Sequence, residues 1–178
     1  MELFKDNIKL RAIETSDAEV LKDMINDPEL EFMVHGWSLP VSLEQQIEWI
    51  KNLDSKVFRF IVEWKSNIVG TCSISSIDYK NSTAALNIKL IGDSNIRGKG
   101  IGTTSLQLLI QYCFDELNLN CLTASILEYN IPSLKLFYKC GFKKDGVLRS
   151  RIYKKGMYHN TVQLSFLKKE YIHERDRQ

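Results

Sequence analysis

The sequence predicts one mixed α/β domain in which a sheet is flanked by helices on both faces. The chain has 178 residues, of which 44% are hydrophobic, so it can bury one sizeable core. Segments with alternating hydrophobicity outnumber those with helical periodicity, and a strand, a helix and another strand follow one another in mid-chain. No repeat or low-complexity linker divides the chain, so we expect a single domain over residues 1–178.

Composition excludes several classes of protein. The chain has 24 basic and 22 acidic residues, and no dense Lys/Arg stripe interleaves with aromatic residues, so we expect no nucleic-acid partner. No stretch approaches the about 20 apolar residues of a membrane span, and the charged segment 1–12 lacks the apolar core of a signal peptide. The four cysteines lie far apart without CxxC pairing, which predicts buried thiols, no metal site and a cytoplasmic location.

The first elements expected are a weak strand over 8–13 and a helix. Ser16 and Glu19 have the spacing of a capping box for that helix, which should end before Pro28.

A second capping box, formed by Ser42 and Gln45, predicts another helix over 42–53. The segment 28–41 between the two helices has two prolines and no hydrophobic period. We therefore expect a shaped loop or an irregular helical turn there.

The remaining chain contains six segments with the pattern of strands and two further helices. The expected strands span 57–64, 68–77, 83–91, 121–127, 146–153 and 157–167. The expected helices span 101–118 and 130–140, and Gly141 follows the second as its C-terminal glycine. The last strands form a hairpin around a turn at 154–156, and 168–178 reads as a solvated charged tail.

The segment 95–110, NIRGKGIGTTSLQLLI, joins a strand directly to a helix. The backbone N–H groups and the dipole at such a helix start favour an anion. Glycine permits close approach to those N–H groups and positive φ, and Arg97 and Lys99 add positive charge. Taken alone, such a run is as typical of a tight turn as of a phosphate site.

Two common nucleotide motifs do not fit this segment. Gly98, Gly100 and Gly102 do not give GxGxxG, which disfavours a dinucleotide fingerprint. Lys99 is followed by glycine and not by Ser or Thr, so a P-loop, and with it an ATP-using kinase or hydrolase, is poorly supported. The pattern that remains is R-x-x-G-x-G.

This pattern resembles the pyrophosphate loop of the GNAT family of acyl-CoA-dependent N-acetyltransferases. The resemblance covers nearly the whole chain, through IKLRAIETSDAE, IDYKN, ALNIKLIG, GKGIGT, YCFDELNLN, KCGF and RSRIYKKGMYHN. Within the family, the chain most resembles the branch that contains the ribosomal-protein N-terminal acetyltransferases and the related acetyltransferases of polyamines and amino sugars. It implies a GNAT-like, mostly antiparallel twisted sheet of about six or seven strands with splayed central strands.

The resemblance implies acetyl-CoA as cofactor. The pantetheine arm would lie where strand 83–91 diverges from strand 121–127, bound by main-chain groups. Asn130 and Ser133 match family residues near the pantetheine, although both residue types are also typical helix caps. The residues expected to bind the cofactor are Leu90, Ile91, Arg97, Gly98, Lys99, Gly100, Ile101, Gly102, Thr103, Asn130, Ser133 and Phe137.

Two positions depart from the family's catalytic pattern. The family often has a tyrosine acid where this chain has Phe137, which we expect in the core, and Tyr138 is the remaining candidate acid. The family's glutamate on the fourth strand is also absent, since the chain has Ala84-Ala85 there. The candidate bases are Glu31, His35 and Asp78.

The resemblance places the acceptor between residues 29–41 and about 149–160. Acidic groups in the first segment suit a polyamine or a peptide amino terminus, and the arginines of the second suit an amino-sugar nucleotide. The partner is therefore a small-molecule or peptide amine, and a homodimer is implied. The acyl chain length stays open.

The leading hypothesis for function is direct acetyl transfer from acetyl-CoA to a primary amine in a ternary complex. The alternative is a non-catalytic acyl-CoA-binding sensor or regulatory module, for which Phe137 and Ala85 are the motivating observations.

Overall fold

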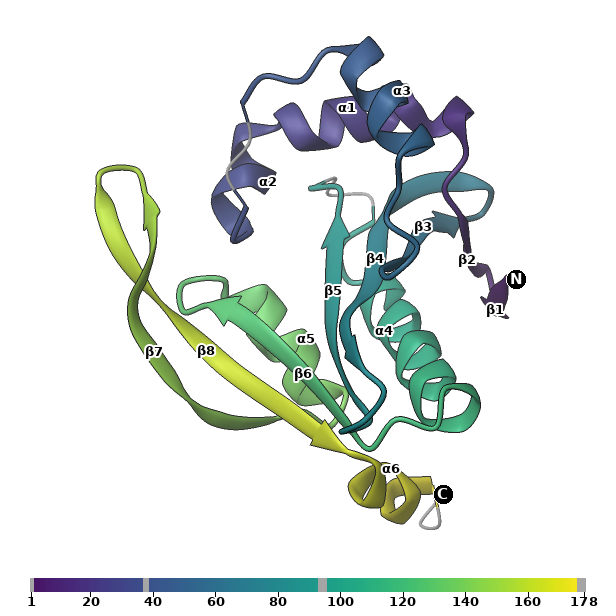
Figure 1. The fold of residues 1–178 in the computed structure, drawn as a ribbon, viewed down its shortest axis with the longest axis vertical. Coiled ribbons are helices and arrows are strands. Elements are labelled where there is room, and N and C mark those ends of the chain that lie inside the picture. The colour runs from purple at the N-terminus through teal and green to yellow at the C-terminus, as the bar shows by residue number, and fades with distance from the viewer. Residues whose placement is uncertain (1, 37–38, 93–95, 176–178) are drawn as a thin grey trace.

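A computed structural model describes residues 2–36, 39–92 and 96–175, and it centres on one open sheet of eight strands (Figure 1). The strand order is β1-β2-β3-β4-β5-β6-β8-β7, and every neighbouring pair is antiparallel except β5 with β6. The strands are β1 (Leu3–Lys5), β2 (Ile8–Ala12), β3 (Phe58–Trp64), β4 (Asn67–Asp78), β5 (Thr83–Leu90), β6 (Cys121–Leu127), β7 (Lys143–Lys154) and β8 (Met157–Leu167). The expected mixed, mostly antiparallel sheet is confirmed, and the short edge strand β1 is an addition to it.

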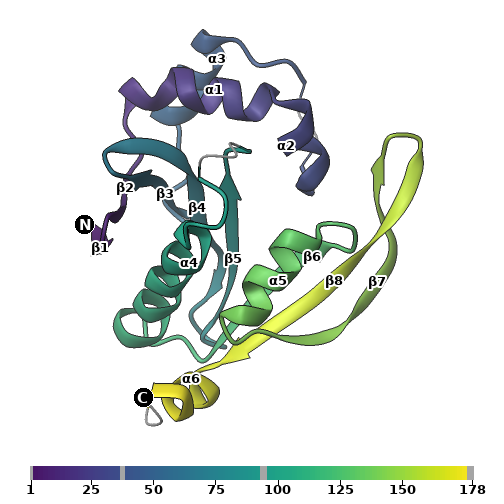
Figure 2. The ribbon, with the colours of Figure 1, turned by 180° about the vertical axis from the view of Figure 1, so that it is seen from behind.

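Helices cover both faces of the sheet, as expected (Figures 1 and 2). A 3-10 turn (Thr15–Asp17) precedes α1 (Ala18–Asn26), which packs with α3 (Leu43–Lys51) over a small apolar cluster on one face. The other face carries α4 (Ile101–Gln111), a turn of π-helix (Tyr112–Glu116) and α5 (Ile131–Lys139), which enclose the larger core. In the described part of the chain no helix is long and apolar enough to cross a membrane.

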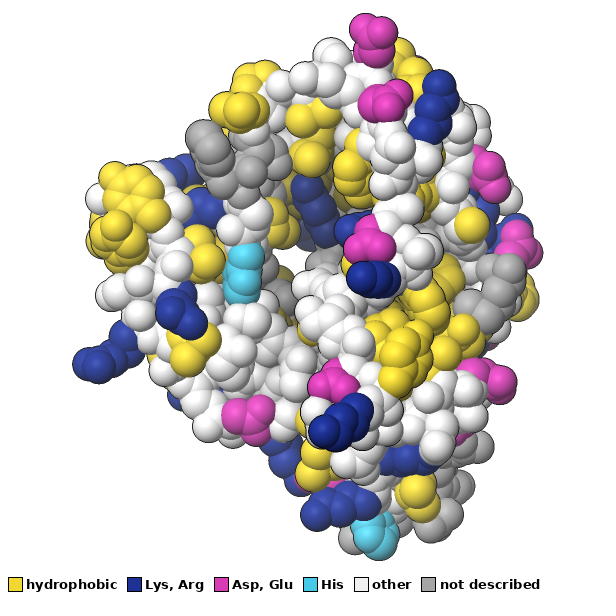
Figure 3. Space-filling view, viewed as in Figure 1, with side chains coloured by type: hydrophobic (Ala, Val, Ile, Leu, Met, Phe, Trp, Pro, Cys, Tyr) yellow, Lys and Arg dark blue, Asp and Glu magenta, His cyan; other side chains and the backbone are white. Residues whose placement is uncertain are grey.

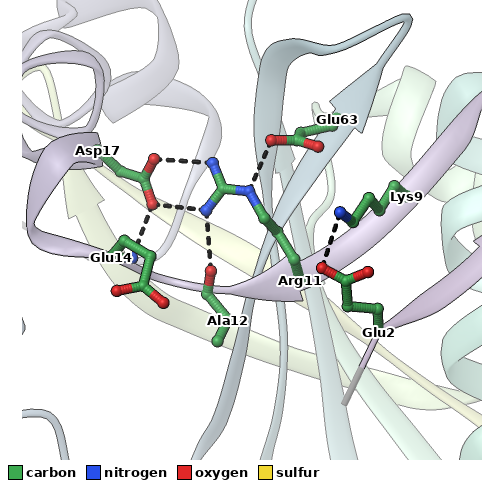
Figure 4. Close-up of polar contacts among 7 residues, drawn as sticks. All are labelled: Glu2, Lys9, Arg11, Ala12, Glu14, Asp17 and Glu63. Atoms are coloured by element: carbon green, nitrogen blue, oxygen red, sulfur yellow. Dashed lines mark hydrogen bonds and ion pairs between the residues drawn. The ribbon is translucent and has the colours of Figure 1, made fainter.

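The start of the first helix differs from the prediction. The capping box joins Glu14 and Asp17, and not Ser16 and Glu19, because the Glu14 N–H donates to the Asp17 carboxylate at 2.8 Å. Arg11 on β2 donates to both Asp17 carboxylate oxygens at 2.8 Å and to Glu63 on β3 at 2.6 Å (Figure 4). This tertiary network selects the cap.

The network around Arg11 also sets the ionisation of Asp17. Burial raises the pKa of Asp17, but the hydrogen bonds from Arg11 and from the Glu14 N–H, with the charge of Arg11, outweigh burial and lower the pKa overall. Asp17 is 3% exposed, so the guanidinium lies beside a carboxylate that little water reaches.

The segment 28–41 begins as a helix, α2 (Pro28–Met33). The Asp27 side chain accepts hydrogen bonds from the N–H groups of Glu29 and Leu30, and Pro28 occupies the first turn, where its missing N–H costs nothing. Pro28 therefore starts a second helix as well as following the first, which confirms the expected helical turn. Trp37, also part of the predicted acceptor loop, lies outside the described residues.

The expected charged tail is helical for most of its length, because residues 168–175 form α6 (Lys168–Arg175). Lys143 pairs with Glu170 at 2.6 Å, and the Tyr171 ring lies 5.0 Å from that of Phe114. The predicted tail residues 176–178 lie outside the described residues.

The last hairpin extends beyond the rest of the sheet and reaches toward α2 (Figure 1). Its turn is Lys155-Gly156, both with positive φ, which is typical of a tight hairpin turn. Lys154 pairs with Met157 at the strand ends, so the turn starts one residue later than predicted.

Candidate active site

The central feature of the site is the divergence of β5 from β6. The two strands pair in parallel only at Thr83, Ala84 and Ala85, opposite Cys121, Leu122 and Thr123. Beyond these three pairs they separate, and a cleft of about 1530 Å³ lies between them and under α1–α3. The predicted splay of central strands is confirmed, and Figure 3 shows the molecule hollowed at this place.

The separated part of β5 offers unused backbone groups to the cleft. Ile91 N–H donates to Val69 O on β4 at 2.9 Å, and bonding directions alternate along an antiparallel strand. The N–H groups of Leu86, Ile88 and Leu90 therefore point away from β4. That of Leu86 completes the last parallel pair with β6, and those of Ile88 and Leu90 face the gap beyond it. Such a free edge can form sheet-like hydrogen bonds with an extended ligand.

The glycine segment has the conformation that an anion site requires. Gly98 and Gly100 have φ of 73° and 77°, as predicted, and Gly100 is the N-cap of α4. A Cβ built at either glycine meets no atom within 4 Å, so the space above the first turn is open. At Gly102 a Cβ would lie 3.2 Å from a methyl of Leu136, so this glycine allows α4 to pack closely.

Most residues predicted to bind the cofactor line this cleft. Those in its lining are Leu90, Ile91, Arg97, Gly98, Gly100, Ile101, Gly102, Thr103, Asn130, Ser133 and Phe137. Lys99 is exposed and is not part of the lining in the described residues. The open glycine turn, the free strand edge and the apolar walls fit the diphosphate and the extended arm of coenzyme A.

Asn130 acts as a helix cap, the interpretation that its residue type suggested. Its Oδ1 accepts a hydrogen bond from Ser133 N–H at 3.1 Å, and its Nδ2 donates to Met33 O at 2.9 Å. The side chain thus joins the start of α5 to the end of α2. Next to it, Tyr129 OH donates to Phe32 O at 2.5 Å and the two rings stack.

The two aromatic residues considered on α5 have different environments. Phe137 is 2% exposed and lies edge to face with Phe142 at 5.0 Å, so its expected core role is confirmed, although one side reaches the cleft. Tyr138 is 44% exposed and does not line the cleft in the described residues. The geometry gives Tyr138 no support as an acid, and that role stays a sequence-based prediction.

The three candidate bases lie in different places. His35 lines the cleft, and its Nε2 is buried without a hydrogen-bond partner. Burial first, and then the charge of Lys154, lowers the pKa of His35. Asp78 lies at the closed end, where it pairs with Thr83 and accepts hydrogen bonds from Asn81, so it is remote from the cleft.

Glu31 is the third candidate, and its carboxylate is already engaged. Lys154, whose side chain is 5% exposed, donates to the Glu31 carboxylate, to Glu31 O and to Gly36 O. This contact brings together the two segments predicted to form the acceptor pocket. Lysine is normally exposed, so the sequence carried no signal for this burial.

Sequence reasoning missed a polar row on the acceptor side. Arg59 on β3 pairs with Ser73 on β4, and Ser73 pairs with Asn87 on β5, so the three residues form one row across the sheet. All three line the cleft, together with Lys89, which lies two rows further along the sheet and pairs with Thr71. The polar residues within the largely apolar strands FRFIVEW and TAALNIKL, Arg59 in the first and Asn87 and Lys89 in the second, were the signal that could have found them.

Lys89 connects the sheet to α1. Its Nζ donates to Met24 O at 2.9 Å. Burial lowers the pKa of Lys89, although the charges of Asp27 and Glu31 act in the opposite direction.

Together, the open sheet, the divergence after three residue pairs and the glycine turn at the start of α4 define a CoA-dependent acyltransferase. A family model described as an acetyltransferase (GNAT) domain matches residues 7–143, and the chain belongs to this family. It is an acetyl-CoA-dependent N-acetyltransferase, and the leading sequence-based hypothesis is confirmed.

Similar proteins extend over almost the whole chain. The uncharacterized N-acetyltransferase p20 of Bacillus licheniformis is 33% identical, covering 95% of this chain and 97% of its own. The spermidine N(1)-acetyltransferase of Vibrio cholerae is 24% identical, covering 93% and 95%. A crystal structure of the Vibrio cholerae spermidine N-acetyltransferase with CoA and spermine has the same fold, with a TM-score of 0.85 and 23% identity over 94% of this chain and 99% of that one.

Proposed function

We propose that the cleft between β5 and β6 is where this enzyme transfers acetyl groups to a small-molecule amine. The observation that carries the proposal is the end of β5–β6 pairing after Ala85, next to the glycine turn. Acetyl-CoA supplies the thioester whose acetyl group is transferred. The first turn of α4 and Arg97 would bind its diphosphate, and the N–H groups of Ile88 and Leu90 would bind the extended arm.

His35 is our proposed base. An amine with a pKa near 10 is mostly protonated at neutral pH, and the attacking nitrogen must be neutral. The lowered pKa of His35 keeps the imidazole neutral, and the unpartnered Nε2 can accept the proton in the tautomer that carries hydrogen on Nδ1. Glu31 is less suited because Lys154 already binds its carboxylate.

Assembly and location belong to the same proposal. The family resemblance supports a homodimer, which light scattering on the purified protein tests. The four cysteines, Cys72, Cys113, Cys121 and Cys140, are free thiols, and three of them are buried, which supports a cytoplasmic location.

The proposal is tested by calorimetry with CoA and acetyl-CoA, followed by a thiol-release assay with primary amines of different charge. We expect binding of both thiol compounds and turnover with at least one amine class. Absence of CoA binding contradicts the site. Binding of acetyl-CoA without turnover on any amine would instead support the non-catalytic module.

A further inference from the structure

The charged residues that line the cleft are all basic. In the described residues the lining contains Arg59, Lys89, Arg97 and Lys139, and it contains no aspartate or glutamate. Arg97 belongs to the glycine segment and Lys139 to the end of α5, on the side proposed for the cofactor. Arg59 and Lys89 lie on the other side, under α1 and α3, where the acceptor would bind.

Arg59 has no anionic partner. Its Nε is buried without a hydrogen bond, and no ion pair to its guanidinium is found in the described part of the chain. Its guanidinium lies over the Trp49 ring, whose centroid is 5.5 Å from the guanidinium carbon. Arg59 is half-buried, its guanidinium is always charged, and its buried Nε has no acceptor, so an anion entering the cleft could pair with it.

The two carboxylates whose charges act on Lys89 are engaged elsewhere. Glu31 binds Lys154, and Asp27 caps α2 by accepting from two N–H groups. Neither lines the cleft. Among the residues that the structure describes, no carboxylate of the lining therefore stands between the positive charges of Arg59 and Lys89 and an acceptor.

The row of Arg59, Ser73 and Asn87 leads from this unpaired charge to the opening between β5 and β6. Neighbouring strands are about 4.8 Å apart, so the backbone of Arg59 lies about 10 Å from that of Asn87. An acceptor lying along the row could place one end on the guanidinium and the other beside the free edge of β5. Asn87 and Ser73 offer neutral hydrogen-bonding groups between the two ends.

We propose that the acceptor is an amine that also carries an anionic group, a carboxylate or a phosphate, and that Arg59 binds this group. This inference rests on the proposed function and names its substrate class. A polyamine would bring two or more positive charges against Arg59 and Lys89 with no carboxylate in the lining, which is unfavourable in a partly desolvated site. Arginine binds both carboxylate and phosphate through a planar pair of N–H donors.

The test measures binding to the CoA-saturated protein by calorimetry, with probes matched except for charge. The first set is 4-aminobutanoate, butylamine and 1,4-diaminobutane, and the second is glucosamine 6-phosphate and glucosamine. We expect the member that carries a carboxylate or phosphate in at least one set to bind about ten- to a hundredfold more tightly than the counterparts that lack the anionic group. The set that shows this difference distinguishes carboxylate from phosphate.

Arg59→Gln should remove that advantage and leave binding of butylamine and glucosamine unchanged, whereas Arg59→Lys should retain part of it. Lys65→Gln is the matched control, because Lys65 also lies over a tryptophan ring, Trp64, but does not line the cleft. Melting temperatures of all variants show whether they fold.

The outcomes separate this inference from the proposed function. Tighter binding of 1,4-diaminobutane than of the anionic probes, an anionic preference that survives Arg59→Gln, or no binding of any anionic probe overturns the inference, even if amines are acetylated. Arg59-dependent binding of an anionic amine without any thiol release supports the inference and counts against the proposed activity.

Discussion

Replacement of Gly100 by alanine separates the role of the glycine segment in the fold from its role in binding the diphosphate of coenzyme A. Gly100 caps α4 at φ 77°, where an L-residue is strained, and its built Cβ meets no protein atom within 4 Å. The variant should therefore lose only about 1–2 kcal/mol of stability from backbone strain, which lowers the melting temperature by about 2–8 °C. Its methyl group would occupy space that we assign to the diphosphate of coenzyme A.

The loss in affinity for CoA can be estimated from one hydrogen bond between the protein and the diphosphate. If the methyl group displaces a phosphate oxygen from one N–H of α4, the variant loses a hydrogen bond to a charged group of about 1.5–3 kcal/mol. The dissociation constant for CoA, measured by calorimetry, should then rise roughly ten- to a hundredfold. The matched control is Gly156→Ala, because Gly156 has φ 81°, also meets nothing within 4 Å and lies in the β7–β8 turn.

The control should lose a similar amount of stability and keep its affinity for CoA. If Gly100→Ala is destabilised like Gly156→Ala but binds CoA with unchanged affinity, the diphosphate does not lie at the start of α4. The same result would remove the physical basis for placing the thioester at the free edge of β5.

Three further variants, at Arg11, His35 and Lys154, test the roles of ionisable side chains that are wholly or partly buried. Arg11→Leu should lower the free energy of unfolding in urea by about 3 kcal/mol, because Asp17 keeps a buried carboxylate without its guanidinium; a loss under 1 kcal/mol contradicts this. Because Asp17 has a lowered pKa in the folded state, its contribution to the free energy of unfolding is present above about pH 4 and is lost on acidification. Between pH 5 and pH 3, Arg11→Leu should therefore lose less stability than the wild-type protein. The low-pH limb of the wild-type pH–rate profile should have a pKa below 6.5 and should vanish in His35→Gln, and an unchanged limb excludes His35 as the base. Lys154→Met should lower the free energy of unfolding by about 2 kcal/mol, because Glu31 and the loop after α2 lose the contacts that hold them. It should also raise KM for the amine more than it lowers kcat. An unaltered KM would show that these contacts do not shape the acceptor pocket.

Local signals in the sequence predicted those parts of the fold that local interactions determine. Ser42 and Gln45 form both hydrogen bonds of the predicted capping box, at 3.2 and 2.8 Å. The positive φ of Gly98 and Gly100 follows from the need for a tight turn between strand and helix. The first cap was predicted wrongly because Arg11, from another element, holds Asp17 in place.

Tertiary packing accounts for the other differences. The run KKEYIHER contains good helix formers but no clear apolar face, and its helix forms where Tyr171 meets the rings of Phe114 and Phe166. In the site, the glycine turn and the divergent strands were predictable from a pattern contiguous in sequence. Arg59 and Lys154 were not assigned roles, because their burial depends on contacts with α3 and α2, far away along the chain.

The short junction between β5 and β6 has a consequence for the lifetime of the protein. Three residue pairs are the sheet's link between β1–β5 and β6–β8, so hydrogen exchange at Ile88 and Leu90, beyond the last pair, should be fast without ligand. A CoA molecule seated across the gap would slow that exchange and add about 2.7 kcal/mol of stability at a concentration one hundred times its dissociation constant. The resistance of this enzyme to unfolding and proteolysis would then increase with the concentration of free CoA around it.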